Sequence, residues 1–227
     1  MTGTAVSRAR PEVSNRTTAL GWLAVGGVVV YVGIDVLLKF LRPGYSLLYN
    51  AESDYGRGSW YWVMDLNFLL RCAISLAAVS ALARTARLDD RGRVGLAMIA
   101  IWAAASGLLA FFADNPEGQP ITWSGIVHLV LAFIAFVCVA AGTILVSVNL
   151  RSDPSWRPVA TVLLALSLAG AAAFLLLGTA TGHKSEPGGL FERIFLGIQL
   201  LWIALVAGFA AVRGPADVGA GSEANAP

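Results

Sequence analysis

The chain has 227 residues, of which 57% are hydrophobic and only 13% are charged. Soluble domains usually carry about 25% charged residues, so this composition, with a mean hydropathy of +0.70, excludes an ordinary soluble domain. The net charge is +2, and the chain has no long basic run and no nucleic-acid-binding motif. We therefore expect a multi-pass protein of the cell membrane, surrounded by the lipid bilayer and without a nucleic-acid partner.

Six apolar segments follow a polar, basic start, and several reach the roughly 20 residues that a helix needs to cross a ~30 Å hydrocarbon core. The predicted spans are Ala19–Leu41, Trp60–Ala83, Val94–Ala113, Ile121–Leu150, Trp156–Thr179 and Leu190–Val212. The sequence thus predicts an all-α fold, a six-span transmembrane helix bundle over residues 19–213. Residues 1–18 are expected to form a polar cytoplasmic tail and residues 214–227 a disordered cytoplasmic tail.

The arginines and lysines near the ends of these spans predict the orientation of the bundle. If the N-terminus is cytoplasmic, the inner side carries Arg8, Arg10, Arg16, Arg84, Arg87, Arg91, Arg93, Arg151, Arg157 and Arg213. The outer side then carries Arg42, Arg57 and Lys184, with Lys39 close by. Because cytoplasmic loops collect positive charge, both termini are predicted to be cytoplasmic.

Charged and amide side chains inside the spans are the candidates for function, because a charge at the bilayer centre costs about 2.5 to 3.5 kcal/mol on insertion scales. With a rise of about 1.5 Å per residue, Asp65 lies roughly 8 Å below the outer end of its span, Arg71 roughly 17 Å and His128 about 10 Å. Glu192 opens the sixth span, and Asp114 closes the third span on the same side.

Nearly all of these residues fall in the outer half of the bundle, whereas the inner halves read as plain Ala, Val and Leu. This asymmetry predicts one polar pocket that opens toward the outer face. Its candidate catalytic residues are Asp65, Asp114, His128 and Glu192. Its candidate substrate-binding residues are Arg71, Asn67, Arg193, Trp62, Trp123 and Gln199. As partners for Arg71, the sequence offers Glu192, Asp65 and Asp114.

Each candidate also has a structural explanation. Asp35 and Lys39, spaced i,i+4 with the acid first, suit an ion pair near the interface. Arg71 with an acid could lock two helices, and Trp62 and Trp123 match an ordinary aromatic belt. His128 could be a hydrogen-bonded structural residue.

Metal and nucleophile motifs are weak in this chain. His128 and His183 lack the H-x₃-H or HExxH spacing of zinc sites, so no metal or other cofactor is expected. Ser124, one turn before His128, resembles a nucleophile–base pair, although such i,i+4 pairs arise often by chance.

Three stretches together, "RPGYSLLYNAESDYGRGSWYWVMDLNFLLR", "FFADNPEG…ITWSGIVHLVLAFIAF" and "GLFERIFLGIQLLW", resemble the bacterial and archaeal membrane family called domain of unknown function 998. The resemblance covers roughly residues 20–213 and implies a six-span bundle. It also implies a set of family positions. They are the S-D-Y-G loop (Ser53 to Gly56), Arg71, Asp114, His128 and the Glu192–Arg193 pair. The family implies no established reaction.

Three functions remain open. The first is an enzyme that acts on a lipid or isoprenoid by acid/base chemistry, either hydrolytic or cyclase-like. The second is a non-catalytic module that binds a lipid head group or a partner protein, because guanidinium groups suit anionic head groups. The third is a small proton-coupled carrier, which would need a polar path through both halves of the bundle.

Overall fold

The computed structural model describes residues 15–115, 119–180 and 187–213, and within these ranges it holds six long helices and no strand. The helices are α1 (Asn15–Leu41), α2 (Tyr61–Thr85), α3 (Asp90–Leu109), α4 (Trp123–Leu150), α5 (Arg157–Ala180) and α6 (Gly188–Ala211), with a short 3₁₀ helix, η1 (Glu52–Gly56), between the first two. Each of the six is long and apolar enough to cross a membrane. The predicted all-α six-span bundle of a multi-pass membrane protein is confirmed.

Some helices extend beyond the predicted apolar runs. The first begins at Asn15 rather than at Ala19, and α3 begins at Asp90 rather than at Val94 because the Asp89 side chain caps it by accepting from the backbone N–H of Gly92 at 2.8 Å. Capping thus carries α3 past its hydrophobic segment. The predicted tails fall largely outside the described residues, which begin at 15 and end at 213.

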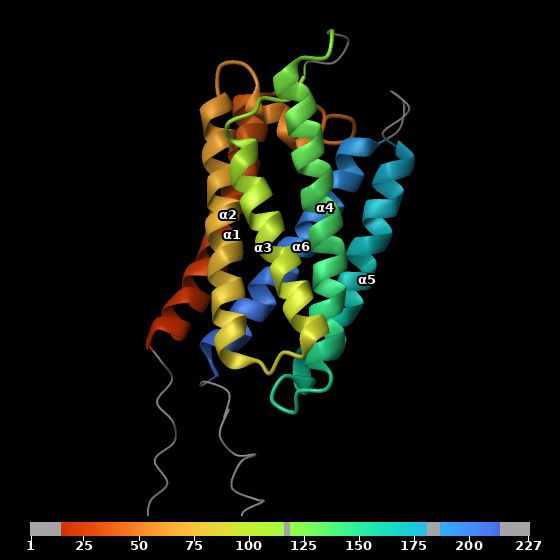
Figure 1. The fold of residues 1–227 in the computed structure, drawn as a ribbon. Helices are drawn as coiled ribbons and strands as arrows, with labels where there is room; N and C mark the ends of the chain where they lie inside the picture. Colours follow the sequence, from red (N-terminus) through yellow and green to blue (C-terminus); the bar gives the residue numbers. More distant parts are fainter. Residues whose placement is uncertain (1–14, 116–118, 181–186, 214–227) are drawn as a thin grey trace, which may run out of the picture.

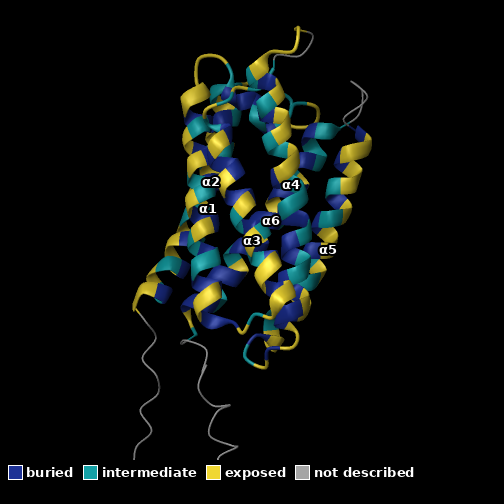
Figure 2. Ribbon diagram, in the orientation of Figure 1, coloured by how far each residue is buried: buried dark blue, intermediate teal, exposed yellow. Residues whose placement is uncertain are grey.

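Helix α6 forms the centre of the bundle, where it packs against α1, α2, α4 and α5 (Figure 1). Of its most apolar 18-residue window, 56% is buried, compared with 17% for α1. Exposed apolar residues cover the outward faces of α1, α4 and α5 (Figure 2). Such an apolar surface suits contact with lipid tails. The helices themselves can cross the hydrocarbon region because a helix satisfies its backbone hydrogen bonds internally.

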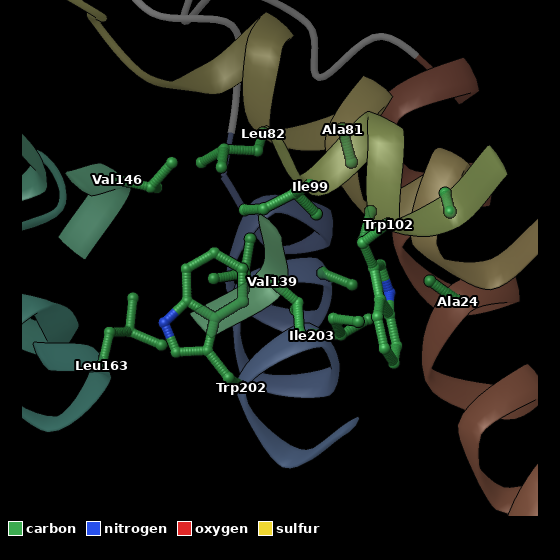
Figure 3. Packing of buried hydrophobic residues seen from close by; sticks show 14 of the residues in the cluster. Ala24, Ala81, Leu82, Ile99, Trp102, Val139, Val146, Leu163, Trp202 and Ile203 are labelled. Atoms are coloured by element: carbon green, nitrogen blue, oxygen red, sulfur yellow. The ribbon is translucent and has the colours of Figure 1, made fainter. Parts of the chain in front are cut away.

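Buried tryptophans fill the core, and each finds a partner for its indole N–H. Trp102 donates to the Ser75 hydroxyl and Trp202 to the Ser147 hydroxyl, both at 3.0 Å; the two indoles lie in the cluster of Figure 3. The expectation of plain Ala, Val and Leu in the inner halves was therefore wrong, because Ser75 and Ser147 lie in those halves. A single serine hardly changes the hydropathy of an apolar span, so the pattern does not reveal these hydroxyls.

The first turn of α1 and the last turn of α6 lie at the same end of the molecule (Figure 1). The opposite end, called the far end below, carries the connection between α1 and α2 (residues 42–60, called the first loop) and the connection between α3 and α4.

Helices α3 and α4 approach closely where two glycines meet. A Cβ added at Gly142 would lie 2.8 Å from the Gly95 carbonyl oxygen, and one added at Gly95 would lie 2.8 Å from that of Gly142. Small residues at such crossings let two backbones pack directly in a membrane.

We expect Gly142→Ala to lower the free energy of unfolding by about 1–3 kcal/mol through overpacking. Gly33→Ala is the matched control, because a Cβ at Gly33 of α1 meets nothing within 4 Å. Equilibrium unfolding in mixed detergent micelles measures both variants. Equal stabilities for the two would contradict the close crossing.

Candidate functional site

The first loop is fastened to the start of α6. Arg193 Nη1 donates to the carbonyl oxygens of Asn50 at 2.7 Å, Gly189 at 3.1 Å and Leu47 at 3.3 Å. Gly189 allows this contact, since a Cβ there would lie 2.1 Å from the Asn50 oxygen. Arg193 therefore holds the loop over the far end of the bundle.

The same loop is also joined to the connection after α3. Arg57 forms an ion pair with Asp54 and donates to the Asn115 carbonyl, and the Ser53 hydroxyl donates to Asp114 Oδ2 at 3.2 Å. Burial raises the pKa of Asp54, although the charge of Arg57 opposes this shift. The S-D-Y-G segment of the first loop thus fastens this loop to the connection between α3 and α4.

Beneath this loop lies a cavity of about 190 Å³, called the main cavity. Its polar lining residues are Glu52, Ser53, Arg71, Asp114, His128 and Glu192. Its apolar lining residues include Phe68, Leu109, Leu129, Ala132, Phe136 and Leu177. Residues from α2, α3, α4, α5, α6 and the first loop thus meet around one space that is lined by both polar and apolar side chains.

Arg71 is 2% exposed, and it has no carboxylate within ion-pair distance among the described residues. Its Nε donates to the Ser106 hydroxyl and its Nη1 to the Tyr31 hydroxyl, both at 3.1 Å. Tyr31 in turn donates to Glu52 Oε1 at 2.5 Å. None of the three acids suggested by the sequence pairs with Arg71. Its acid is Glu52, reached through Tyr31.

Aromatic rings surround the same guanidinium. Its central carbon lies 4.8 Å from the Trp102 ring centroid, 5.2 Å from that of Phe68 and 5.8 Å from that of Tyr31. Cation–π attraction is strongest where water is excluded. No described residue accepts from Nη2 of Arg71, so the two N–H groups of this nitrogen remain for a ligand in the main cavity.

His128 is held in one tautomer. Its Nδ1 lies 2.7 Å from the Phe112 carbonyl oxygen, and because a carbonyl can only accept, Nδ1 carries the hydrogen. In the neutral ring, Nε2 then has a lone pair, and no described residue donates to it. His128 therefore brings a potential base to the main cavity.

Glu192 is 8% exposed, lines the main cavity and makes no hydrogen bond or ion pair with any described residue. Asp114 is better satisfied, since it also accepts from the Asn115 backbone N–H at 2.7 Å. A buried carboxylate without donors is costly. Glu192 is thus the least satisfied acid of the main cavity.

Four residues of the predicted pocket, Arg71, Asp114, His128 and Glu192, lie together on the main cavity. Asp65 is half-buried and does not line it. Asn67 is buried, with its amide donating to the Tyr31 carbonyl at 3.4 Å. Gln199 is also fully buried, and its side-chain amide has no hydrogen-bond partner among the described residues.

The remaining candidates lie elsewhere. Trp62 and Trp123 are exposed on the outside of the bundle, where the aromatic belt explains them. Arg193 lines a different cavity. The expected ion pair between Asp35 and Lys39 does not form, because Lys39 Nζ donates to the Tyr45 carbonyl at 2.6 Å instead.

Two residues of this site were not chosen from the sequence, Glu52 and Tyr31. Glu52 lies in a loop, where no helical periodicity reveals its direction. Tyr31 lies one turn before Asp35 on the same face of α1, which was the available signal, but a tyrosine in a span usually reads as an apolar residue.

The metal-ligating side chains of the described residues do not indicate a metal site. Within residues 15–115, 119–180 and 187–213, no three His, Cys, Asp or Glu side chains are grouped so that they could hold a metal ion. His183 lies outside these ranges. Ser124, the possible nucleophile, donates to the Ala113 carbonyl at 3.0 Å and does not line the main cavity.

The comparisons with known proteins give a family and no function. The family model described as "Protein of unknown function (DUF998)" matches residues 24–208, which is most of the chain. No curated protein matches the chain, and no solved structure matches it. The chain therefore belongs to the DUF998 family of proteins of unknown function.

Proposed function

We propose that this protein is a membrane enzyme that binds the head group of a lipid or isoprenoid in the main cavity and modifies it by acid/base chemistry. The supporting observation is that an unpartnered carboxylate (Glu192), an imidazole lone pair (His128) and a guanidinium donor (Arg71) line one cavity together with several apolar side chains. Such a lining suits a molecule with a polar head and an apolar tail.

Entry from the bilayer is supported by the position of Leu129. This residue lines the main cavity and is also 52% exposed on the surface of the bundle. With Leu177 of α5 on the same cavity, it suggests that a lipid tail leaves between α4 and α5. One water occupies about 30 Å³ of the liquid, so the about 190 Å³ volume suits a small head group.

The three groups can divide the work of a transfer or hydrolysis. His128 Nε2 takes the proton of a hydroxyl or a water as its oxygen attacks. Arg71 Nη2 donates to the oxygen on which negative charge develops. Glu192, in its protonated form, gives a proton to the departing group, and the proton gained by His128 then restores Glu192 through the product or water.

A proton-coupled carrier has weaker support. The buried polar groups between the main cavity and the other end include Ser75 and Ser147, whose hydroxyls accept from indole N–H groups of the core. Tryptophans occupy that part of the bundle rather than a polar path. Non-catalytic lipid binding remains the alternative that the experiment below separates.

A comparison of membrane lipids tests the proposal. Cells that overproduce the wild-type chain should accumulate a product lipid, or lose a substrate lipid, that cells producing Glu192→Gln do not. Asp90→Asn is the control, because Asp90 is an exposed acid of α3 at the other end of the bundle. A lipid that co-purifies with both wild type and Glu192→Gln, without any change in the lipidome, would favour binding without catalysis.

We also propose that the protein lies in the cell membrane with both termini in the cytoplasm, on the strength of the arginine distribution. Green fluorescent protein fused after residue 227 should fluoresce, because it folds in the cytoplasm, and alkaline phosphatase at the same position should be inactive. An active phosphatase fusion would reverse the orientation and place the far end in the cytoplasm.

A further inference from the structure

A second cavity lies between α1 and α6, and we propose that it binds a phospholipid head group that carries both a phosphate and an amine. Its volume is about 170 Å³, and its polar wall is formed by Tyr31, Asp35, Glu52 and Arg193. This site, called the side cavity, does not depend on the proposed catalytic function of the main cavity, because its ligand would be held by Asp35 and Arg193, which do not line the main cavity.

The side cavity is accessible from the hydrocarbon region. Val32, which lines it, is 48% exposed. Gly197 also lines it, and a Cβ added there would meet nothing within 4 Å. A lipid can therefore approach between α1 and α6 with its tails along the outside of the bundle.

Unpartnered polar atoms gather at this site. The Oδ1 atom of Asp35 and the Nε and Nη2 atoms of Arg193 are buried, and no described residue bonds to them. A buried polar group without a hydrogen-bond partner is costly, and native structures rarely contain one. Asp35 and Arg193 do not satisfy each other, since they form no ion pair within 4.0 Å. A ligand that supplies both an acceptor and a donor would satisfy both residues.

The geometry of Arg193 favours a phosphate. Nε and Nη2 lie along one edge of the guanidinium, which is the arrangement that holds two oxygens of a phosphate or carboxylate. The third nitrogen, Nη1, is already occupied by the three carbonyls of the first loop and of α6. Tyr55 also lies beside this guanidinium, with its ring centroid 5.6 Å from the central carbon, so a ligand would meet the Nε–Nη2 edge of Arg193 next to Tyr55.

The charges of the side cavity favour an amine beside that phosphate. Asp35 contributes a carboxylate beside the single cation of Arg193, whereas Glu52 is already linked to Arg71 through Tyr31. A head group with a phosphate alone would occupy Arg193 and leave the Asp35 carboxylate uncompensated, which is unfavourable at low dielectric. An ammonium next to the phosphate can donate to Asp35 Oδ1 and restores the balance.

Occupancy of this site should also steady the main cavity. Arg193 holds the first loop, and Glu52 of that loop lines both cavities. A ligand that fixes Arg193 would fix the loop and therefore the wall that carries Glu52. This connection is local, through one side chain and the loop that it holds.

Native mass spectrometry of the purified full chain tests the proposal, using phosphatidylethanolamine and phosphatidylglycerol with identical acyl chains as probes. We expect the wild type to retain phosphatidylethanolamine at least about tenfold better, equivalent to about 1.4 kcal/mol. Asp35→Asn should abolish this preference, and Arg193→Gln should weaken retention of both lipids. Asp90→Asn, which changes an exposed acid outside both cavities, should leave the preference unchanged.

Gly197→Leu keeps the test decisive if the charge variants fold poorly. This substitution adds a side chain where the structure has open space, so the variant should fold and yet obstruct the approach to the side cavity. We expect it to retain several-fold less phosphatidylethanolamine. Equal retention of the two lipids by the wild type, or a preference that survives both Asp35→Asn and Gly197→Leu, would overturn the proposal.

Discussion

Replacing Arg71 by leucine should lower the free energy of unfolding by about 3–5 kcal/mol, the usual effect of removing one member of a buried charged pair. Leucine retains apolar contact with the rings around Arg71, but it removes the donor to Tyr31. The carboxylate of Glu52, which is 2% exposed and accepts from Tyr31, then has no cation at the other end of this hydrogen-bond chain. Equilibrium unfolding in mixed micelles measures the loss.

Two further variants separate charge from packing. Tyr31→Phe breaks the link between Arg71 and Glu52 but keeps both charges, so its effect should be smaller than that of Arg71→Leu. In the double variant Arg71→Leu/Glu52→Gln, the uncompensated carboxylate is gone, and we expect part of the stability to return. If Glu52→Gln brings no recovery, the role assigned to the Arg71–Tyr31–Glu52 chain is wrong.

The level of the polar residues could be predicted from the sequence, because depth in a membrane helix follows directly from residue number. Arg71, His128 and Glu192 were placed in the same half of the bundle on this basis, and they line one cavity. Depth does not give direction across helices, however. Asp65 lies at a similar level on α2, yet it points to a different face from Arg71 and does not line that cavity.

Pairing could not be predicted for a related reason. The partner of Arg71 depends on how α1 packs beside α2 and on where the first loop folds, and neither follows from hydropathy. Tyr31 and Glu52 are 21 positions apart in the sequence and yet share a 2.5 Å hydrogen bond. The loop enters the site because Gly189 lets the Asn50 carbonyl approach α6, a tertiary contact with no sequence pattern of its own.

The single predicted pocket is divided in the structure. Arg71 and Arg193, which the sequence assigned to one substrate site, line different cavities, and Glu52 lies between them on the wall of both. The two arginines also make different contacts. The first is held by Ser106 and Tyr31 deep in the bundle, whereas the second holds the loop that closes the site.

His128→Ala should lower kcat for the lipid identified by the lipidome comparison by about 10²–10⁴-fold, the range typical of a general base, with a smaller change in KM. The stability loss should be about 1–3 kcal/mol, because the variant leaves the Phe112 carbonyl without its donor. A loss of turnover much larger than the loss seen in a variant of equal stability distinguishes a base from a structural histidine. Lipid turnover by purified protein in vesicles gives both constants.

Ser124→Ala provides the matched control for this measurement. Ser124 lies one turn before His128 on α4 and was the possible nucleophile in the sequence, but its hydroxyl donates to the Ala113 carbonyl and does not line the main cavity. Turnover should therefore persist in Ser124→Ala. If Ser124→Ala abolished turnover as fully as His128→Ala, a covalent Ser–His mechanism would replace base catalysis through Nε2. If neither variant changed turnover, the base would have to be one of the acids that line the same cavity, with Glu192 the first to examine because it lacks a partner among the described residues.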